Sequence, residues 1–129
     1  LDITGEITIS AWIKLNRIGT LGYEWQNILS KRENMGATTN YEFRVGVNGF
    51  SAYDEIEFAV FNGDWCMYQS TNLDLTTNTW IHVVVTYNNS NFYVYGNGVR
   101  KNTGVVMGTC PITMLANNAE ILIGNHFDI

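Results

Sequence analysis

One stretch of the chain, residues 79–99, constrains the fold more than any other. Residues 80–87 are rich in β-branched and aromatic side chains, which favour a pleated, half-buried strand. The polar run 88–91 then interrupts this pattern with short side chains that bond to the nearby backbone and favour turns. Residues 92–96 begin a second strand, and residues 96–98 provide another turn in which φ can be positive. The stretch therefore predicts consecutive antiparallel hairpins.

The same period of two recurs elsewhere in the chain, with apolar side chains at every second position of residues 41–47 and 55–61. In the first such segment, Ile7, Ile9, Ala11, Ile13 and Leu15 alternate with Glu6, Thr8, Ser10, Trp12 and Lys14. Helical periodicity is nearly absent, so the chain predicts an all-β, antiparallel two-sheet sandwich or jelly roll. The strands predicted in this way span residues 6–15, 27–32, 41–47, 55–61, 65–70, 80–87, 92–96 and 120–124.

Length and charge limit the class of protein. The 129 residues suit one domain covering 1–129. Seven basic and twelve acidic residues give a net charge of −5, and the basic residues form no stripe, which argues against binding to nucleic acid. No apolar run approaches the length of about 18 residues that a membrane-spanning helix needs, so we expect no membrane insertion.

The two cysteines, Cys66 and Cys110, match no metal-binding or redox spacing. One interpretation is a disulfide that closes a loop of about 45 residues in an oxidising compartment. The other is a pair of buried thiols that act as small apolar side chains. The sequence alone leaves both interpretations open.

Several segments together resemble a known family. Residues 7–14 are similar to an opening strand of the form Thr-apolar-Ser-Ala-Trp-apolar, and residues 28–31 resemble the strand after it. Residues 79–87 are similar to Trp-x-His-Val-x-apolar-Thr-Tyr, residues 92–99 to the hairpin that follows, and residues 120–124 to a late strand ending in Gly. Over nearly its whole length the chain thus resembles the laminin G-like, concanavalin A-like jelly rolls. This resemblance implies a noncatalytic, extracellular recognition module.

The resemblance also implies a further, closing strand, which residues 125–129 do not match, and the N-terminal lead is short as well. We therefore expect a domain truncated at both ends. A sandwich that lacks an edge strand exposes backbone donors, acceptors and apolar surface, which favours pairing with another chain. On this basis we expect a homo-oligomer formed through a sheet edge.

Glucanases with this jelly roll carry Glu-x-Asp-x-Glu on one strand, and the nearest match here includes Glu55 and Glu57. The two carboxylates share a strand face, but Ala59 stands where the third belongs, which argues against glycoside hydrolysis. The histidine in the strand motif, His82, has no triad partner nearby in sequence and no Gly-x-Ser-x-Gly motif to serve. We interpret it as a packed residue and expect no enzyme activity.

Calcium is the cofactor that the resemblance implies, at the rim of the sandwich. Calcium binds about six to eight oxygen ligands, usually including carboxylates. Asn40 occupies the position before a strand at which laminin-type members place an Asp, and Asp54 and Asp64 lie in neighbouring loop sequence. The predicted metal ligands are therefore Asn40, Asp54 and Asp64.

Sugar recognition by such folds uses exposed aromatic rings and polar side chains on loops, because a flat ring matches the apolar face of a pyranose. We interpret Trp12 and Trp80 as core residues, since they belong to framework strands. The predicted ligand-binding residues lie in or beside loops and are Tyr23, Trp25, Tyr53, Asn62, Asp64, Trp65 and Tyr68. The expected ligand is a glycan. Adhesion to an extracellular protein and a self-associating structural role are the alternatives.

Overall fold

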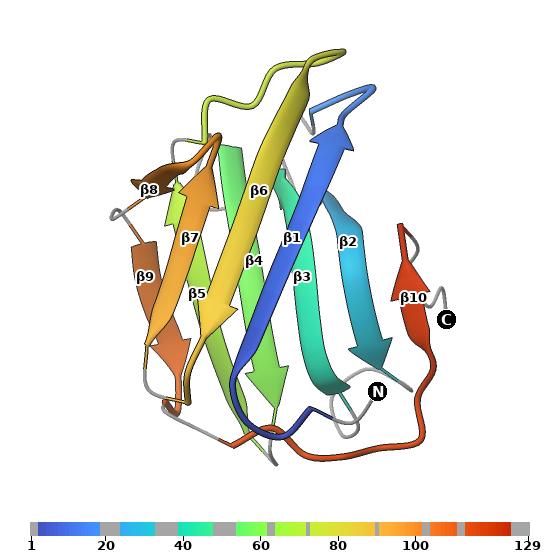
Figure 1. Cartoon of the computed structure of the whole chain (residues 1–129), viewed down its shortest axis with the longest axis vertical. Helices are drawn as coiled ribbons and strands as arrows, with labels where there is room; N and C mark the ends of the chain where they lie inside the picture. Colours follow the sequence, from blue (N-terminus) through green and yellow to red (C-terminus); the bar gives the residue numbers. More distant parts are fainter. Residues whose placement is uncertain are drawn as a thin grey trace.

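The computed structural model describes residues 3–18, 24–32, 39–47, 54–61, 64–71, 73–89, 91–101, 104–110 and 113–124. These segments form two antiparallel sheets packed face to face (Figure 1). The strands are β1 (Ile7–Lys14), β2 (Glu24–Arg32), β3 (Thr39–Val47), β4 (Asp54–Phe61), β5 (Trp65–Thr71), β6 (Trp80–Tyr87), β7 (Phe92–Gly96), β8 (Val99–Lys101), β9 (Gly104–Gly108) and β10 (Ile121–Ile123). The all-β jelly-roll sandwich that the sequence predicts is therefore confirmed.

One sheet has four strands in the order β1-β6-β7-β8, and the other has six in the order β10-β2-β3-β4-β5-β9. In the four-stranded sheet, β1 pairs with β6 without interruption, from Ile7 opposite Tyr87 to Lys14 opposite Trp80. Burial along β6 alternates residue by residue, so one row of side chains enters the core and the other faces outward. No helix in the described segments is long and apolar enough to cross a membrane.

Aromatic rings from both sheets meet in the core around Phe58 of β4. The Phe58 ring lies 6.4 Å from Phe43 in its own sheet, and 6.1 Å from Tyr87 and 5.9 Å from Phe92 in the facing sheet, between centroids. Tyr87 and Phe92 stack on each other at 4.5 Å. Such ring pairs add to the stabilisation that burial of their area provides. This cluster therefore joins the two sheets.

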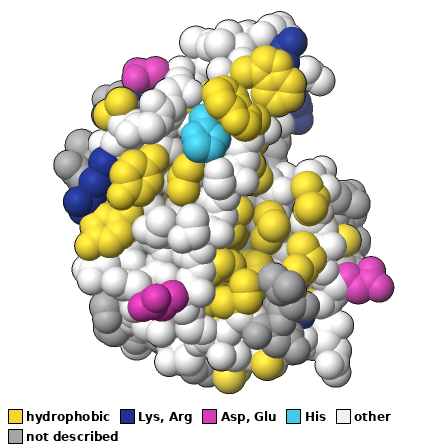
Figure 2. Space-filling model, viewed as in Figure 1, with side chains coloured by type: hydrophobic (Ala, Val, Ile, Leu, Met, Phe, Trp, Pro, Cys, Tyr) yellow, Lys and Arg dark blue, Asp and Glu magenta, His cyan; other side chains and the backbone are white. Residues whose placement is uncertain are grey.

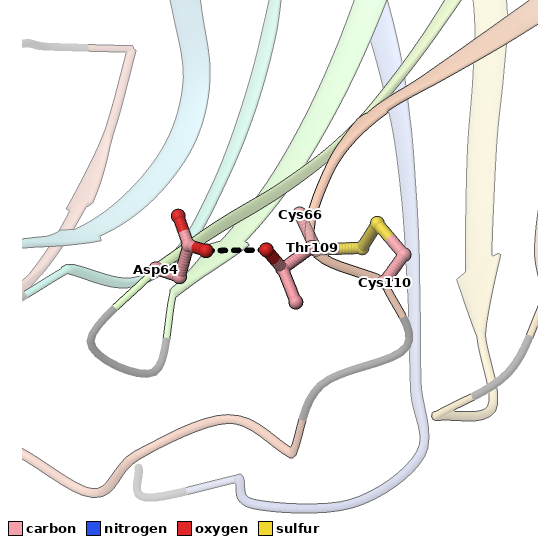
Figure 3. Close-up of a disulfide and its surroundings, with 4 residues drawn as sticks. All are labelled: Asp64, Cys66, Thr109 and Cys110. Atoms are coloured by element: carbon pink, nitrogen blue, oxygen red, sulfur yellow. Dashed lines mark hydrogen bonds between the residues drawn. A yellow bond between two sulfur atoms is a disulfide. The ribbon is translucent and has the colours of Figure 1, made fainter.

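The period of two in the sequence did not predict β9, because this strand is short and has Gly at both ends. It pairs with β5, with Gly108 opposite Cys66, and this pairing brings Cys110 beside Cys66. The two residues form a disulfide with their Cα atoms 5.1 Å apart (Figure 3). The disulfide interpretation is therefore correct, and the interpretation as two free thiols is wrong.

The turn between β7 and β8 is built as the sequence predicts. Asn97 and Gly98 have φ values of 49° and 79°, the left-handed pair that a two-residue hairpin turn requires. Asn97 also bonds to β6: the His82 N–H donates to its Oδ1 at 3.0 Å, and its own N–H donates to the His82 carbonyl at 2.8 Å. The hairpin is thus tied to the strand that carries His82.

A buried cation ties β2 to the segment that leads to β10. The Lys31 ammonium donates to the Asn117 carbonyl at 2.7 Å, and to the Asn117 Oδ1 and the Ala119 carbonyl at 2.8 Å each. Burying a charged group is costly unless it is hydrogen-bonded in this way. Residues 113–120, which cross the end of the sandwich on the way to β10 (Figure 1), are therefore held against β2.

We expect removal of the disulfide by the double substitution Cys66→Ala/Cys110→Ala to lower the free energy of unfolding. The two cysteines are 44 residues apart, and the chain-entropy model gives about 4 kcal/mol for a loop of this length. Urea denaturation monitored by tryptophan fluorescence measures the loss, and reduced wild-type protein is the control. A loss below about 1 kcal/mol would show that the loop is already restricted in the unfolded chain.

Candidate functional site

The outer surface of the four-stranded sheet carries a band of rings, which we call the aromatic face. Trp12 of β1 and Trp80 of β6 are 64% and 60% exposed, far more than is usual for such large apolar side chains. Figure 2 shows hydrophobic side chains on both sides of a histidine on this surface. The rings that make up the aromatic face are those of Trp12, Trp80, His82, Tyr93 and Tyr95.

Specific contacts hold these rings in place. Trp12 lies opposite His82 on the neighbouring strand, and their ring centroids are 5.0 Å apart. A hydrogen bond of 2.8 Å joins the Ser10 hydroxyl to His82 Nε2. Toward β8, the Arg100 guanidinium lies 4.2 Å from the centroid of the Tyr93 ring. The aromatic face therefore combines apolar rings with groups that can form hydrogen bonds.

The interpretation of Trp12 and Trp80 as core residues is wrong. Trp12 lies in the same row as Ser10, and Trp80 in the same row as His82, whereas Ile81 on the next position is buried. Side chains alternate between the two faces of a strand, so a Trp among polar neighbours in this row faces outward. The period of two was thus the signal that could have identified these residues.

A cleft of about 500 Å³ opens beside the aromatic face, between β1 and the edge formed by β2 and β10. Trp12 and Trp25 both line it, so the cleft and the aromatic face meet at Trp12. Apolar side chains gather on this side of the molecule (Figure 2). Further lining residues are apolar, such as Ala11, Ile13, Leu15 and Ile28, or polar, such as Lys14, Gln26 and Asn27.

The outer side of the six-stranded sheet has a different character, because it carries a buried ionic network. The Arg44 guanidinium donates to Glu57 Oε1 at 2.5 Å from Nη2 and 2.6 Å from Nε. The other oxygen of Glu57 accepts a hydrogen bond of 2.5 Å from Gln69 Nε2. Glu42 lies 3.2 Å from Arg32 and 3.9 Å from Arg44. The network therefore spans four adjacent strands.

Burial raises the pKa of Glu57 above 4.5, although the charge of Arg44 and the hydrogen bond from Gln69 lower it; nearby Glu42 adds to the rise. The side chains of Glu42 and Glu57 are each almost fully buried. Both oxygens of Glu57 are already bonded, and Ala59 adds no third carboxylate beside Glu42. This is the arrangement of a structural ion pair.

A family model described as the concanavalin A-like lectin/glucanases superfamily matches residues 1–128. The chain belongs to this superfamily. The match confirms the resemblance read from the sequence motifs, and it points to a carbohydrate- or protein-binding module. The curated proteins and the solved structures that were also compared contain no match.

In this superfamily member, the predicted ligand-binding residues that the structure describes do not form one site. Trp25 lines the cleft and lies under the Arg44 guanidinium, which is 4.5 Å from its ring centroid. Tyr68 is only 8% exposed: its ring stacks on Phe92 at 5.7 Å, and its hydroxyl donates to the Lys101 carbonyl at 3.4 Å. Burial raises the pKa of Tyr68. We therefore reassign Tyr68 from the ligand site to the core.

Asp64 lies at another place, directly before β5. Its carboxylate accepts a hydrogen bond from the Thr109 hydroxyl, beside the disulfide (Figure 3). This contact fastens the residue directly before β5 to the residue directly after β9. Other predicted positions lie outside the described residues, namely Tyr23, Tyr53, Asn62 and the side chain of Trp65.

The three predicted calcium ligands do not converge either. Because β3 and β4 are antiparallel with Asp54 opposite Val47, Asp54 lies at the far end of the hairpin from Asn40, about 24 Å along the strands. Asn40 itself is fully buried, and its amide oxygen and nitrogen have no hydrogen-bond partner among the residues that the structure describes. The predicted ligand set therefore does not fit one calcium ion. The described segments hold no group of three or more His, Cys, Asp or Glu that could bind a metal.

We expect the difference in free energy of unfolding between the wild-type protein and the Glu57→Gln variant to change in favour of the variant as the pH rises. The folded-state pKa of Glu57 is raised, so this carboxyl contributes most to stability below about pH 4.5 and loses that contribution as the pH passes the folded pKa. Glutamine does not titrate and serves as the reference. Urea denaturation at a series of pH values from about 4 to 7 measures the difference.

Glu120→Gln, which removes the same charge from an exposed position, is the matched control for this experiment. A difference that grows in favour of the wild type with rising pH would contradict the prediction. It would mean that the attraction of Arg44 outweighs the cost of burying the ionised carboxylate.

Proposed function

We propose that this superfamily member is a noncatalytic, extracellular module that binds carbohydrate on its aromatic face. The observation that carries the proposal is the exposure of Trp12 and Trp80 on one sheet surface. Contiguous exposed apolar area of this kind marks a binding surface, because leaving it in water is unfavourable. A flat indole ring offers a sugar a broad apolar surface. The face of the indole ring is also electrostatically negative, so it attracts the C–H groups of the sugar.

The neighbours of these rings favour a sugar as the ligand. Ser10 and His82 lie between the rings, and Thr8 and Thr86 continue the same outward rows. Hydroxyl and imidazole groups both donate and accept hydrogen bonds, as the hydroxyls of a sugar also do. The neutral polar character of this surface thus supports glycan binding over the alternative, adhesion to a protein.

The spacing of the rings supports an extended glycan chain as the ligand. Trp12, Trp80 and Tyr95 belong to three adjacent strands, β1, β6 and β7. Neighbouring strands lie about 4.8 Å apart, and diagonal positions about 7 to 8 Å apart. Several rings can therefore contact successive sugars of one chain, whereas a single monosaccharide would cover one ring.

Two further observations support the other parts of the proposal. The Cys66–Cys110 disulfide supports an extracellular location, since such bonds persist in oxidising compartments. The bonding of both Glu57 oxygens supports a noncatalytic role, because a general acid or nucleophile needs a carboxylate that can reach the substrate.

We expect Trp12→Ala and Trp80→Ala each to weaken glycan binding by about tenfold or more, since each removes a large exposed ring. A glycan array identifies the ligand, and isothermal titration calorimetry measures the affinity of each variant. Val106→Ala is the matched control, because Val106 is also exposed but belongs to the other sheet. Trp25→Ala tests whether the cleft takes part.

The array is run in calcium and in EDTA. Equal signals would show binding by the rings alone, and a signal lost in EDTA would show that a cation takes part. A blank array under both conditions would overturn the glycan proposal in favour of a protein partner.

We expect no hydrolysis of β-glucans by the wild-type protein, since the buried carboxylates of Glu42 and Glu57 are engaged in ion pairs. Release of reducing sugar is the measurement, and Glu55→Gln and Glu57→Gln are the test variants. Hydrolysis that disappears in either variant would identify the protein as a glycosidase.

A further inference from the structure

A second, smaller cleft, which we call the end cleft, lies at the opposite end of the four-stranded sheet from Trp12 and Trp80. It has a volume of about 240 Å³ and lies where β1 begins, β6 ends and β7 begins, three strand ends that meet at one end of the sheet (Figure 1). Its described lining residues are Glu6, Ile7, Thr8, Thr86, Tyr87, Asn88 and Tyr93. Since β6 lies between β1 and β7, the end cleft is on the face of the sheet and not at its edge.

The residues opposite each other on the three strands explain why this surface is hollow. Thr8 of β1 lies opposite Thr86 of β6, and Thr86 lies opposite Tyr93 of β7. The two threonines are short, whereas Glu6, Asn88 and Tyr93, which line the rest of the end cleft, are longer. The end cleft therefore has a floor that carries two hydroxyl groups. Tyr93 also belongs to the aromatic face, so the two surfaces are continuous.

Two of the longer side chains are held in place by contacts within the molecule. The Asn88 Oδ1 accepts a hydrogen bond of 2.8 Å from the Asn91 N–H. The Arg100 guanidinium lies 4.2 Å from the centroid of the Tyr93 ring and packs against it. Side chains that are ordered before a ligand arrives lower the entropic cost of binding it. The end cleft is thus partly preorganised.

We propose that the end cleft binds one uncharged sugar of the glycan chain, and that Glu6 selects against acidic sugars there. Among the described lining residues, Glu6 is the only one with a charged side chain. Arg100 lies over the Tyr93 ring and does not belong to this described lining. An ionised carboxylate only accepts hydrogen bonds, so it binds sugar hydroxyls and repels a second carboxylate or a sulfate.

The size and position of the end cleft fit this assignment, which rests on the proposed function. Its volume lies below the range of about 300 to 1,000 Å³ that is typical of pockets for drug-sized ligands, and suits a single sugar ring. Thr8 on its floor is four residues from Trp12 along β1, which corresponds to about 13 Å. A glycan with one sugar in the end cleft therefore extends over the rings of the aromatic face.

Binding of hexasaccharides by the intact chain tests the assignment. Hexasaccharides of glucose, galactose or mannose are each compared with the same compound after oxidation of its C6 hydroxyls to carboxylates. This oxidation places an acid in the end cleft whichever way the chain lies. We expect the wild type to bind the neutral form about fivefold or more tightly than the acidic form, measured by isothermal titration calorimetry.

The variant Glu6→Gln should reduce this preference about fivefold, because repulsion between two charges about 4 Å apart in water has that effect. High salt should reduce the preference of the wild type but not that of Glu6→Gln. Glu120→Gln is the matched control, since it removes the same charge from an exposed position outside the described lining, and it should leave the preference unchanged.

A second variant, Thr86→Val, tests the floor of the end cleft by replacing a hydroxyl with a methyl group. It should weaken binding of the neutral form about threefold or more, because a hydrogen bond to the sugar is lost. Thr76→Val, at an exposed position before β6, is its control and should bind as the wild type does.

The outcomes separate this assignment from the proposed function. Equal binding of neutral and acidic forms by the wild type, or an unchanged preference in Glu6→Gln, overturns the role of Glu6. Binding that is lost in Trp12→Ala but unchanged in Thr86→Val places the glycan on the rings alone and overturns the end cleft as a sugar site. In each of these cases the proposed function stands, whereas no binding of any hexasaccharide or array glycan overturns the proposed function itself.

Discussion

The ring contacts between the two sheets are the interaction on which the other features of this molecule depend. Phe58 of one sheet packs against Tyr87 and Phe92 of the other, and these contacts select which row of each strand enters the core. Since side chains alternate along a strand, placing one row inside forces the other row outside. The exposure of Trp12 and Trp80 is therefore a consequence of how the core is packed.

The two outer faces produced by this packing have opposite properties. The outer face of the four-stranded sheet presents exposed rings with few charges among them, which suits recognition of a ligand. The six-stranded sheet instead buries charge, with Arg44 held between Glu57 and Glu42. In a superfamily named for both lectins and glucanases, this contrast favours binding over hydrolysis, because Glu42 and Glu57 are bonded to their neighbours and the rings are open.

The sequence predicted most of the fold and little of the site. A period of two located β1 to β7 and β10, and Asn97-Gly98 located a turn, because these signals act over a few residues. The same period of two places Trp12 in the outward-facing row of β1. Because Trp12 belongs to a framework strand, it was nevertheless interpreted as a core residue. β9 was missed because five residues flanked by glycines carry too little periodicity.

By itself, the sequence determined the alternation of apolar and polar side chains along the strands, the sandwich class and the superfamily. Each of these depends on residues that are close along the chain. Only the tertiary structure decided which distant residues meet. Strand pairing joined Cys66 to Cys110 and Trp12 to His82, and it separated Asn40 from Asp54 at opposite ends of a hairpin. The physical reason is that a period of two specifies which way a side chain points, whereas its neighbours depend on strand order and register.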